Sequence, residues 1–279
     1  EGVDVLGPDD DVAEAPPLAA GEEVLDDRRR RSDQRKGGLG DHRGFDADHL
    51  CDAAHRGLAL VGDLHEERAD VHLDVDKSAS GRLVNDRNLL IDRHRSHGGD
   101  LISAPVFGRP LAAQAAKLFI ITAGSEKSLN VCESLFSIIG QRTIRVGDAP
   151  QAANIVKLCG NFMIMSAVES LAEAMTLAKK SGVDKKTLLH ALTSTIFTAP
   201  LYETYGQILI EQSFKPAGFT APLGLKDMKL VSQVAEINRT PMPFLGILRD
   251  HILSAIAQKG EDVDWSAIAH VVEKSAEAN

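Results

Sequence analysis

Apolar residues recur at intervals of three and four along a stretch that begins near Pro150 and continues to about Ser181. The repeating positions are Ile155, Leu158, Phe162, Met165, Ala172 and Met175. This spacing places them on one face of an α-helix, and a helix of that length extends about 45 Å at 1.5 Å per residue. The pattern therefore predicts one long helix with an apolar face turned to a hydrophobic core.

The rest of the C-terminal part also has helical periodicity, with recognisable start signals. Asp184 and Asp264 are typical N-cap residues, because a carboxylate accepts hydrogen bonds from the free amides of a first helical turn. The expected helices are 185–194, 200–212, one starting near 226, 243–260 and one starting after 264, with a loop at 218–224. Residues 148–279 are therefore predicted to form an all-α domain.

Short β-rich apolar runs precede this domain. The expected strands are Leu101–Phe107, Leu118–Ala123 and Thr143–Val146. Ser125 is expected to cap a helix through about Ile139, between the last two strands. Residues 93–147 therefore have the strand and helix order of a β-α-β unit.

The first 92 residues have a different composition. Residues 1–100 contain one isoleucine, one aromatic residue and no methionine, and arginine outnumbers lysine by twelve to two. So few large apolar side chains bury little area, whereas ordering the chain costs roughly 1–2 kcal/mol per residue. We expect weak order over residues 1–92, with short strands possible at Leu58–Val61 and Val71–Val75. A wrong-frame or antisense translation is one explanation, and a genuine low-complexity extension is the other.

Two polar residues interrupt the apolar pattern of the long helix. Lys157 and Asn161 are four residues apart and share one helix face, and Asn154 extends this polar stripe by one turn. A lysine and two amides on an otherwise apolar helix are what a buried acid/base site requires. The alternative is a solvated lysine on an ordinary amphipathic helix.

Three motifs occur in the order typical of one enzyme family. They are Lys157 with Asn161, the segment Ser103–Pro110, and Leu225–Met228 followed by a helix and a Pro-x-Pro turn. This combination resembles the β-hydroxyacid dehydrogenases, the family of 3-hydroxyisobutyrate dehydrogenase. The resemblance covers about residues 94–279.

The resemblance implies a fold and an activity. The fold would be an α/β remnant of a Rossmann-type sheet followed by an all-α domain like the C-terminal domain of 6-phosphogluconate dehydrogenase. Members of the family exchange a hydride between NAD or NADP and a small hydroxy acid or the matching aldehyde. Their helical domains pair, so the resemblance also implies a homo-oligomer.

The resemblance also assigns roles to individual residues. Lys157 would be the catalytic acid/base, and Asn161, Ser103 and the backbone around Gly108 would bind the substrate. Lys226 and Asp227 would lie at the cofactor, and the alternative for this pair is an exposed helical turn. This chain departs from the usual substrate segment in having Phe107 where the family has serine and Arg109 where it has glycine.

Arg109 has two interpretations. Its guanidinium could clamp a substrate carboxylate through two hydrogen bonds. It could also be a surface arginine after a turn. Phe107 removes a hydroxyl donor and is expected to narrow the pocket.

The family's phosphate-binding sequence is missing from the N-terminal part. Such a loop needs a strand and then Gly-x-Gly-x-x-Gly, so that bare amides approach the pyrophosphate. The nearest match, residues 38–43, lacks the third glycine and follows a basic polar run. Two alternatives therefore stay open beside the dehydrogenase, namely a non-catalytic helical dimerisation module and an imine reductase-like enzyme. Lys157 counts against the imine reductase.

Charge and cysteine content exclude some classes of protein. The net charge of −9 provides no basic surface for nucleic acid, and the histidines have no metal-ligand spacing. Three scattered cysteines do not indicate a disulfide framework. No apolar run approaches the ~20 residues that span a bilayer. These features predict a cytoplasmic protein without a membrane or nucleic-acid partner.

Overall fold

The computed structural model describes residues 59–65, 68–74 and 91–277. All of them lie within the unit Asp46–Asn279. The expectations for residues 1–58 and 75–90, including weak order and the wrong-frame origin, lie outside the described residues, as does the Gly-containing segment 38–43.

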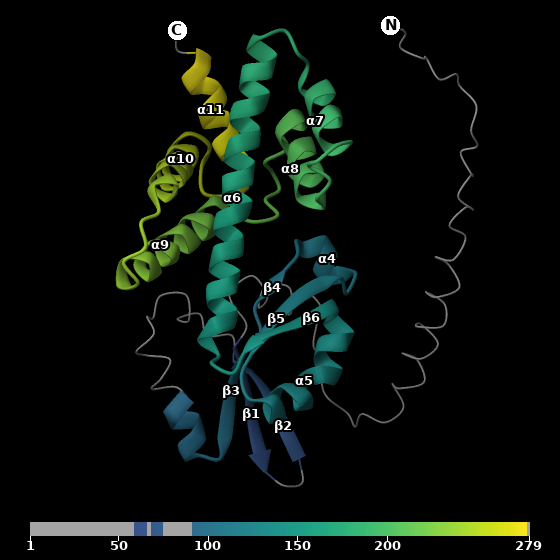
Figure 1. The fold of residues 1–279 in the computed structure, drawn as a ribbon, viewed down its shortest axis with the longest axis vertical. Coiled ribbons are helices and arrows are strands. Elements are labelled where there is room, and N and C mark those ends of the chain that lie inside the picture. The colour runs from purple at the N-terminus through teal and green to yellow at the C-terminus, as the bar shows by residue number, and fades with distance from the viewer. Residues whose placement is uncertain (1–58, 66–67, 75–90, 278–279) are drawn as a thin grey trace, which may run out of the picture. The chain divides into compact units, whose positions relative to one another are not determined.

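The described strands form one mixed sheet (Figure 1). Its strands are β1 (Ala59–His65), β2 (Arg68–Asp74), β3 (Gly99–Ser103), β4 (Val106–Phe107), β5 (Leu118–Ala123) and β6 (Gly140–Gly147). The strand order is β2-β1-β3-β5-β4, and β6 lies off this path and also pairs with β5. Strands β1 and β2 overlap the two short strands expected before residue 93.

Only one strand pair in this sheet is parallel. Strands β5 and β6 run parallel and are connected by helix α5 (Glu126–Ile139), whereas the other pairs are antiparallel. Ser125 caps α5 as expected, accepting a hydrogen bond from the amide of Ser128. The β-α-β prediction is thus confirmed for β5-α5-β6, and this unit is the part with the arrangement of a doubly wound fold. A short helix, α4 (Pro110–Gln114), connects β4 to β5.

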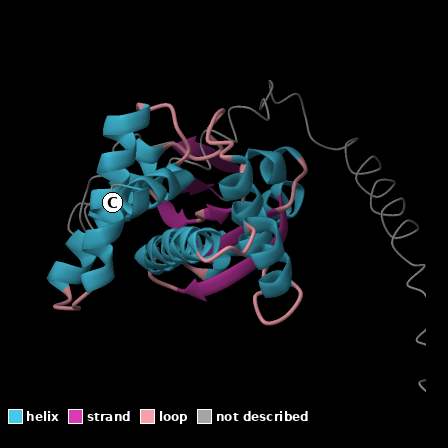
Figure 2. Cartoon of the chain, turned by 90° about the horizontal axis from the view of Figure 1, so that it is seen from above, coloured by secondary structure: helices cyan, strands magenta, loops and turns pink. Residues whose placement is uncertain are grey.

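Helices make up the chain after β6 (Figures 1 and 2). They are α6 (Gln151–Lys180), α7 (Lys185–Thr193), α8 (Pro200–Glu211), α9 (Ala221–Ile237), α10 (Pro243–Lys259), the 3₁₀ turn η1 (Trp265–Ala267) and α11 (Ile268–Glu277). Asp184 caps α7 and Asp264 caps η1, both as expected. Most predicted boundaries agree within one or two residues.

Helix α6 passes through the core of the helical part, as its periodicity predicts. Met165, Ala172 and Met175 are buried there among side chains of α8 to α11, and Leu158 and Phe162 are partly buried against them. The sequence pattern missed one member of this face. Glu169 is fully buried, with its Oε1 atom 2.7 Å from Nδ1 of His251 on α10.

Helix α9 starts earlier than expected. Residues 221–224 belong to the helix instead of the predicted loop, so that Lys226 lies in its second turn. Two features explain this start. Pro222 is tolerated in a first turn, where its missing amide costs no hydrogen bond. The amide of Ala221 also donates to the carbonyl of Val263, which fixes the chain at the helix entry.

Helix α6 is long and apolar enough to cross a membrane, by length and composition alone. The helix contains no uninterrupted apolar run of about 20 residues, because polar residues such as Lys157 and Glu169 interrupt it, so the run-based prediction of no membrane span did not include it. A third of the most apolar window, with a mean hydropathy of 1.4, is buried inside the protein. The core helix of a soluble protein meets the same criterion, so the feature is weak evidence for a membrane span.

Candidate active site

The first turns of α6 pack against the sheet. Ala153 is buried with Ile121 and Ala123 of β5, and the side chain of Phe107 covers this small apolar cluster. The polar stripe of α6 begins at the next turn. The junction between the sheet and the helix therefore holds Lys157 at a fixed depth.

The amine of Lys157 lies over an aromatic ring. Its Nζ atom is 4.3 Å from the centroid of the Phe107 ring, a cation–π arrangement. Among the residues that the structure describes, no hydrogen bond or ion pair reaches this amine. Burial lowers the pKa of Lys157 to about 8, with the charge of Asp227 acting in the opposite direction and that of Lys226 in the same direction. The Lys157 side chain is half-buried, which is more enclosed than the solvated-lysine alternative assumes.

A charged pair from α9 faces the same stripe. Asp227 is buried, and its Oδ2 atom accepts a hydrogen bond from Nδ2 of Asn161 at 2.6 Å. Its Oδ1 atom lies 2.9 Å from Nζ of the half-buried Lys226. The structure thus brings Lys157, Asn161, Lys226 and Asp227 together, and the exposed-turn alternative for the α9 pair does not describe Asp227.

The other expected substrate residues lie at the end of β3 and beyond β4. Ser103 is buried, and its hydroxyl oxygen accepts a hydrogen bond from Nδ2 of Asn154 at 2.9 Å. This bond ties the sheet directly to the polar stripe of α6. Gly108 is exposed and has a φ of +145°, a backbone conformation that favours glycine.

The replacement of the family serine by Phe107 is matched by a glycine on α6. A Cβ atom at Gly160 would collide with the Phe107 ring. Because the ring needs the space that this glycine leaves, the two positions form a complementary pair. That Phe107 narrows a substrate pocket stays a prediction.

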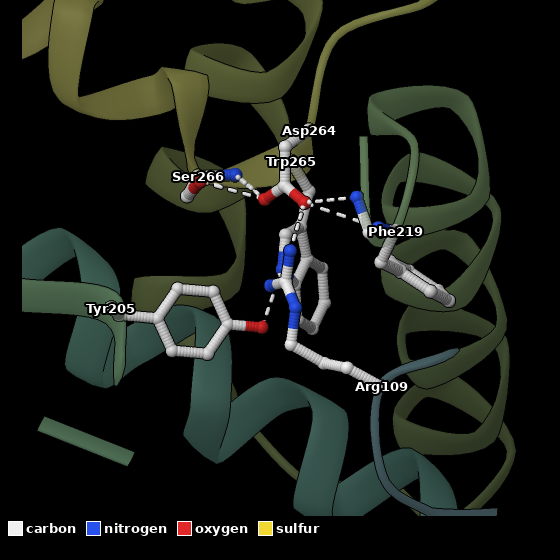
Figure 3. A network of polar contacts seen from close by, with 7 residues as sticks. Arg109, Tyr205, Phe219, Asp264, Trp265 and Ser266 are labelled. Atoms are coloured by element: carbon white, nitrogen blue, oxygen red, sulfur yellow. Dashed lines mark hydrogen bonds and ion pairs between the residues drawn. The ribbon is translucent and has the colours of Figure 1, made fainter. Parts of the chain in front are cut away.

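Arg109 lies in a different environment from the one that either interpretation of the sequence assumed. Its Nη2 atom donates to Oδ2 of Asp264 at 2.8 Å, and its guanidinium lies 5.3 Å from the ring centroid of Tyr205 (Figure 3). Arg109 is half-buried and Asp264 is buried. The structure therefore gives the guanidinium protein partners and does not place it with the other expected substrate residues.

Sequence reasoning identified Asp264 only as a helix cap. Its Oδ1 atom does cap η1, accepting from the amide and the hydroxyl of Ser266. Its Oδ2 atom also accepts from the amides of Gly218 and Phe219. Contacts that join residues 155 positions apart in the sequence, such as Arg109 and Asp264, leave no trace in local periodicity.

The described residues include no cradle for the phosphates of a dinucleotide at the turn before α5. The N-terminus of α5, which follows a parallel strand, already holds the carboxylate of Asp100 bonded to Ser125 and Ser128. This carboxylate would repel a pyrophosphate, so no phosphate cradle forms at this turn.

Comparison with known proteins identifies the helical part. Residues 152–272 match the model of the family described as NAD-binding of NADP-dependent 3-hydroxyisobutyrate dehydrogenase. Residues 152–272 of this chain are thus similar to that domain of the 3-hydroxyisobutyrate dehydrogenase family. The resemblance proposed from the motifs is thereby confirmed, as is the cofactor class of the family, NAD or NADP.

Relatives of this family match beyond the helical part. An uncharacterised oxidoreductase of Bacillus subtilis, YfjR, is 36% identical over 179 residues, which cover 64% of this chain and 62% of the relative. The 2-hydroxy-3-oxopropionate reductase of Escherichia coli is 27% identical, with 64% and 61% covered. The chain thus spans less than two thirds of the length of these curated relatives.

A solved structure of the family has a similar fold. The Mycobacterium tuberculosis 3-hydroxyisobutyrate dehydrogenase, determined with L-serine, superimposes with a TM-score of 0.60 at 26% identity. The match covers 68% of this chain and 66% of that structure. The described architecture, mostly helical with a small sheet, is therefore similar to that of part of this structure.

Proposed function

We propose that this chain contains the catalytic helical domain of an NAD(P)-dependent oxidoreductase acting on a small β-hydroxy acid or its semialdehyde. The observation that carries the proposal is the half-buried Lys157 side chain, whose amine lies over the Phe107 ring, one helical turn from Asn161, and has no partner among the described residues. A buried amine with a lowered pKa is suited to acid/base chemistry. Similarity to the family gives the reaction class.

The charges at the site favour an anionic substrate. Protonated Lys157 and Lys226 contribute two positive charges, and Asp227 contributes one negative charge. The excess of one positive charge in a partly desolvated site attracts a carboxylate. Ser103 and the backbone at Gly108 provide a hydroxyl and an amide on the sheet side, where the carboxylate would bind.

The lowered pKa supplies the base that the reaction needs. A bound nicotinamide would accept the hydride from the carbon that carries the substrate hydroxyl, with Lys226 beside it. As that C–H bond breaks, the hydroxyl proton passes to the neutral amine of Lys157 and a carbonyl forms. Asn161, held by Asp227, hydrogen-bonds the substrate oxygen and keeps it near the amine.

The fraction of chains in which the Lys157 amine is neutral depends on its pKa. With a pKa of about 8, roughly one amine in ten is neutral at pH 7. With the reference value, roughly one in 3,000 is neutral. Burial therefore raises the supply of the reactive form about 300-fold, and the protonated form serves aldehyde reduction.

Two further features of the family are carried over as proposals. The chain assembles as a homo-oligomer through its helices, and it works in the cytoplasm. The family's dimeric helical domains, together with exposed apolar side chains on α6 such as Met163 and Leu177, support the first.

An activity assay tests the proposal. The purified chain is assayed with NAD and NADP against 3-hydroxyisobutyrate, L-serine and short semialdehydes. Lys157→Ala should lower turnover by about 10²–10⁴-fold, the usual contribution of a positioned acid/base. Lys179→Ala is the matched control, because Lys179 is an exposed lysine of the same helix.

Two outcomes contradict the proposal. Undiminished turnover in Lys157→Ala would remove the assigned base. Failure of the folded chain to bind NADPH or NADH in calorimetric titrations would instead favour the helical dimerisation module.

A further inference from the structure

We propose that Arg109 is a positioning residue whose ion pair with Asp264 holds the Phe107 side chain against the amine of Lys157. This inference rests on the proposed function, because it assumes that Lys157 is the base, but the experiment that tests it does not require activity. It assigns to Arg109 a role other than binding substrate, and it makes Phe107 the residue that sets water access and pocket width at the base.

The anchor of this arrangement is Asp264. Its carboxylate is 1% exposed. It accepts hydrogen bonds from Ser266 on one oxygen, and from the amides of Gly218 and Phe219 on the other, all within the helical part. A carboxylate held by four such bonds has little freedom to move, so Arg109 must adapt to Asp264.

The guanidinium of Arg109 is also confined on its other sides. It lies over the ring of Tyr205, whose hydroxyl oxygen accepts from Nε1 of Trp265 at 2.9 Å (Figure 3). Any side chain at Gly218 would collide with the guanidinium. An ion pair, an aromatic face and a close backbone approach thus define a single position for this group.

The short backbone segment between Arg109 and Phe107 couples the positions of the two side chains. Arg109 and Phe107 are separated by a single residue. The carbonyl of Arg109 accepts from the amides of Ala112 and Ala113, which start α4, and Phe107 pairs with Phe119 in the sheet. With both ends of this short segment fixed, the ring is held over Gly160 and against Lys157.

A substrate clamp that uses Nη2 of Arg109 would require the ion pair to break, whereas Nη1 has no hydrogen-bond partner among the described residues. Breaking the pair would leave the carboxylate of Asp264 buried without its cation, which is a large penalty in a protein interior. The Coulombic attraction of Asp264 raises the pKa of Arg109 against the opposing effect of burial, so the pair favours the charged form. The geometry therefore supports a fixed guanidinium.

The position of the Phe107 ring determines how far the amine of Lys157 is shielded from water. Burial is the main reason for its low pKa, and the Phe107 ring is the apolar group in contact with it. The charged groups that face the amine among the described residues are Asp227 and Lys226 of α9, and neither touches Arg109. Loss of the ring's cation–π attraction would lower the pKa by roughly 0.4–1.5 units. Full rehydration would raise it from about 8 toward the reference value of 10.5, which is the larger effect.

The test measures the titration of Lys157 directly. Lysines are acetylated competitively with trace acetic anhydride over pH 6–11, and the extent of labelling at each lysine is read by peptide mass spectrometry. In the wild-type chain, Lys157 should label slowly and titrate near pH 8. In Arg109→Gln and in Phe107→Ser, it should titrate at least one pH unit higher, and above that pKa, where the amine is neutral in every variant, it should label faster.

Controls separate positioning from general loosening of the fold. Arg145→Gln removes another Arg–Asp pair, which β6 makes with Asp148, and should leave the titration of Lys157 unchanged. Arg109→Lys should restore part of the wild-type behaviour. If Arg109 acts through Phe107, adding Arg109→Gln to Phe107→Ser should shift the titration no further.

The outcomes are distinct from those of the activity assay, because labelling needs neither cofactor nor turnover. An unchanged Lys157 titration in Arg109→Gln would overturn the positioning role, and a raised KM with that unchanged titration would establish the substrate clamp instead. If Arg109→Gln fails to fold, Phe107→Ser and Arg109→Lys carry the test, and an unchanged titration in both overturns it.

Discussion

Two charged centres in this chain are built in opposite ways. Asp264 is buried with hydrogen-bond or ion-pair partners on both of its oxygens, including the guanidinium of Arg109. Lys157 is held over an aromatic ring, and no described residue bonds to its amine. The first centre is saturated by the protein, and the second is left open.

This difference separates a structural role from a chemical one. A saturated charge contributes by holding several segments in one arrangement, and it has no capacity left for a ligand. An open, desolvated charge is costly to the fold and becomes useful when a substrate completes its coordination. The three predictions below test that distinction, beginning with the one for which we expect the largest effect.

Removal of the saturated charge should damage the fold most. Asp264→Ala leaves the Arg109 guanidinium and the amides of Gly218 and Phe219 without their acceptor. We expect a loss of about 3–5 kcal/mol in the free energy of unfolding, measured by urea denaturation. Asp262→Ala, at an exposed aspartate paired with Lys215, is the control and should leave the midpoint unchanged. Equal effects of the two would show that Asp264 is not a structural centre.

Removal of the open charge should stabilise the fold. At pH 7 the native state holds Lys157 protonated against its lowered pKa, so Lys157→Met should raise the free energy of unfolding by about 1–3 kcal/mol. Between pH 8 and the reference value of 10.5, the native state binds fewer protons here than the unfolded state. Wild-type stability therefore rises with pH across this window, and the advantage of the variant should shrink. A destabilised Lys157→Met would contradict the costly-charge interpretation, and Lys179→Met should change little.

Glu169 is an intermediate case with a smaller expected effect. Burial raises the pKa of this carboxyl, while His251 acts in the opposite direction. A raised pKa means that the native state binds more protons than the unfolded state above pH 4.5, so wild-type stability falls as pH rises through that region. In Glu169→Gln this slope should diminish, as measured by urea denaturation at several pH values. An unchanged slope would mean that His251 fully compensates, and Glu173→Gln is the exposed control on the same helix.

The sequence was sufficient for features whose causes are local. The long helix, the caps at Ser125, Asp184 and Asp264, and the sharing of one face by Lys157 and Asn161 all follow from spacing over a few residues. The start of α9 was misplaced because the backbone bond from Ala221 to Val263 joins distant segments.

The candidate site was predictable in part for the same reason. The motif residues on α6 and α9 were identified from the sequence and lie close together in the structure. The ion pair between Arg109 and Asp264, in contrast, depends on tertiary folding. The burial of Glu169 was also missed, because a carboxylate on a core face looks polar in the sequence and its partner His251 lies on another helix. Charges that are neutralised by distant partners cannot be recognised from periodicity.

Helix α6 has a consequence for how such a protein can diversify. The same thirty-residue rod carries the reactive amine at one end and much of the helical core along its length. A residue inserted or deleted in α6 between Lys157 and the core would rotate Lys157 by about 100° about the helix axis. Its amine would then point away from the Phe107 ring and the Asp227 carboxylate. We therefore expect substitutions that alter substrate preference to occur in the short segment between β3 and α4, where a side chain can be replaced without rotating α6.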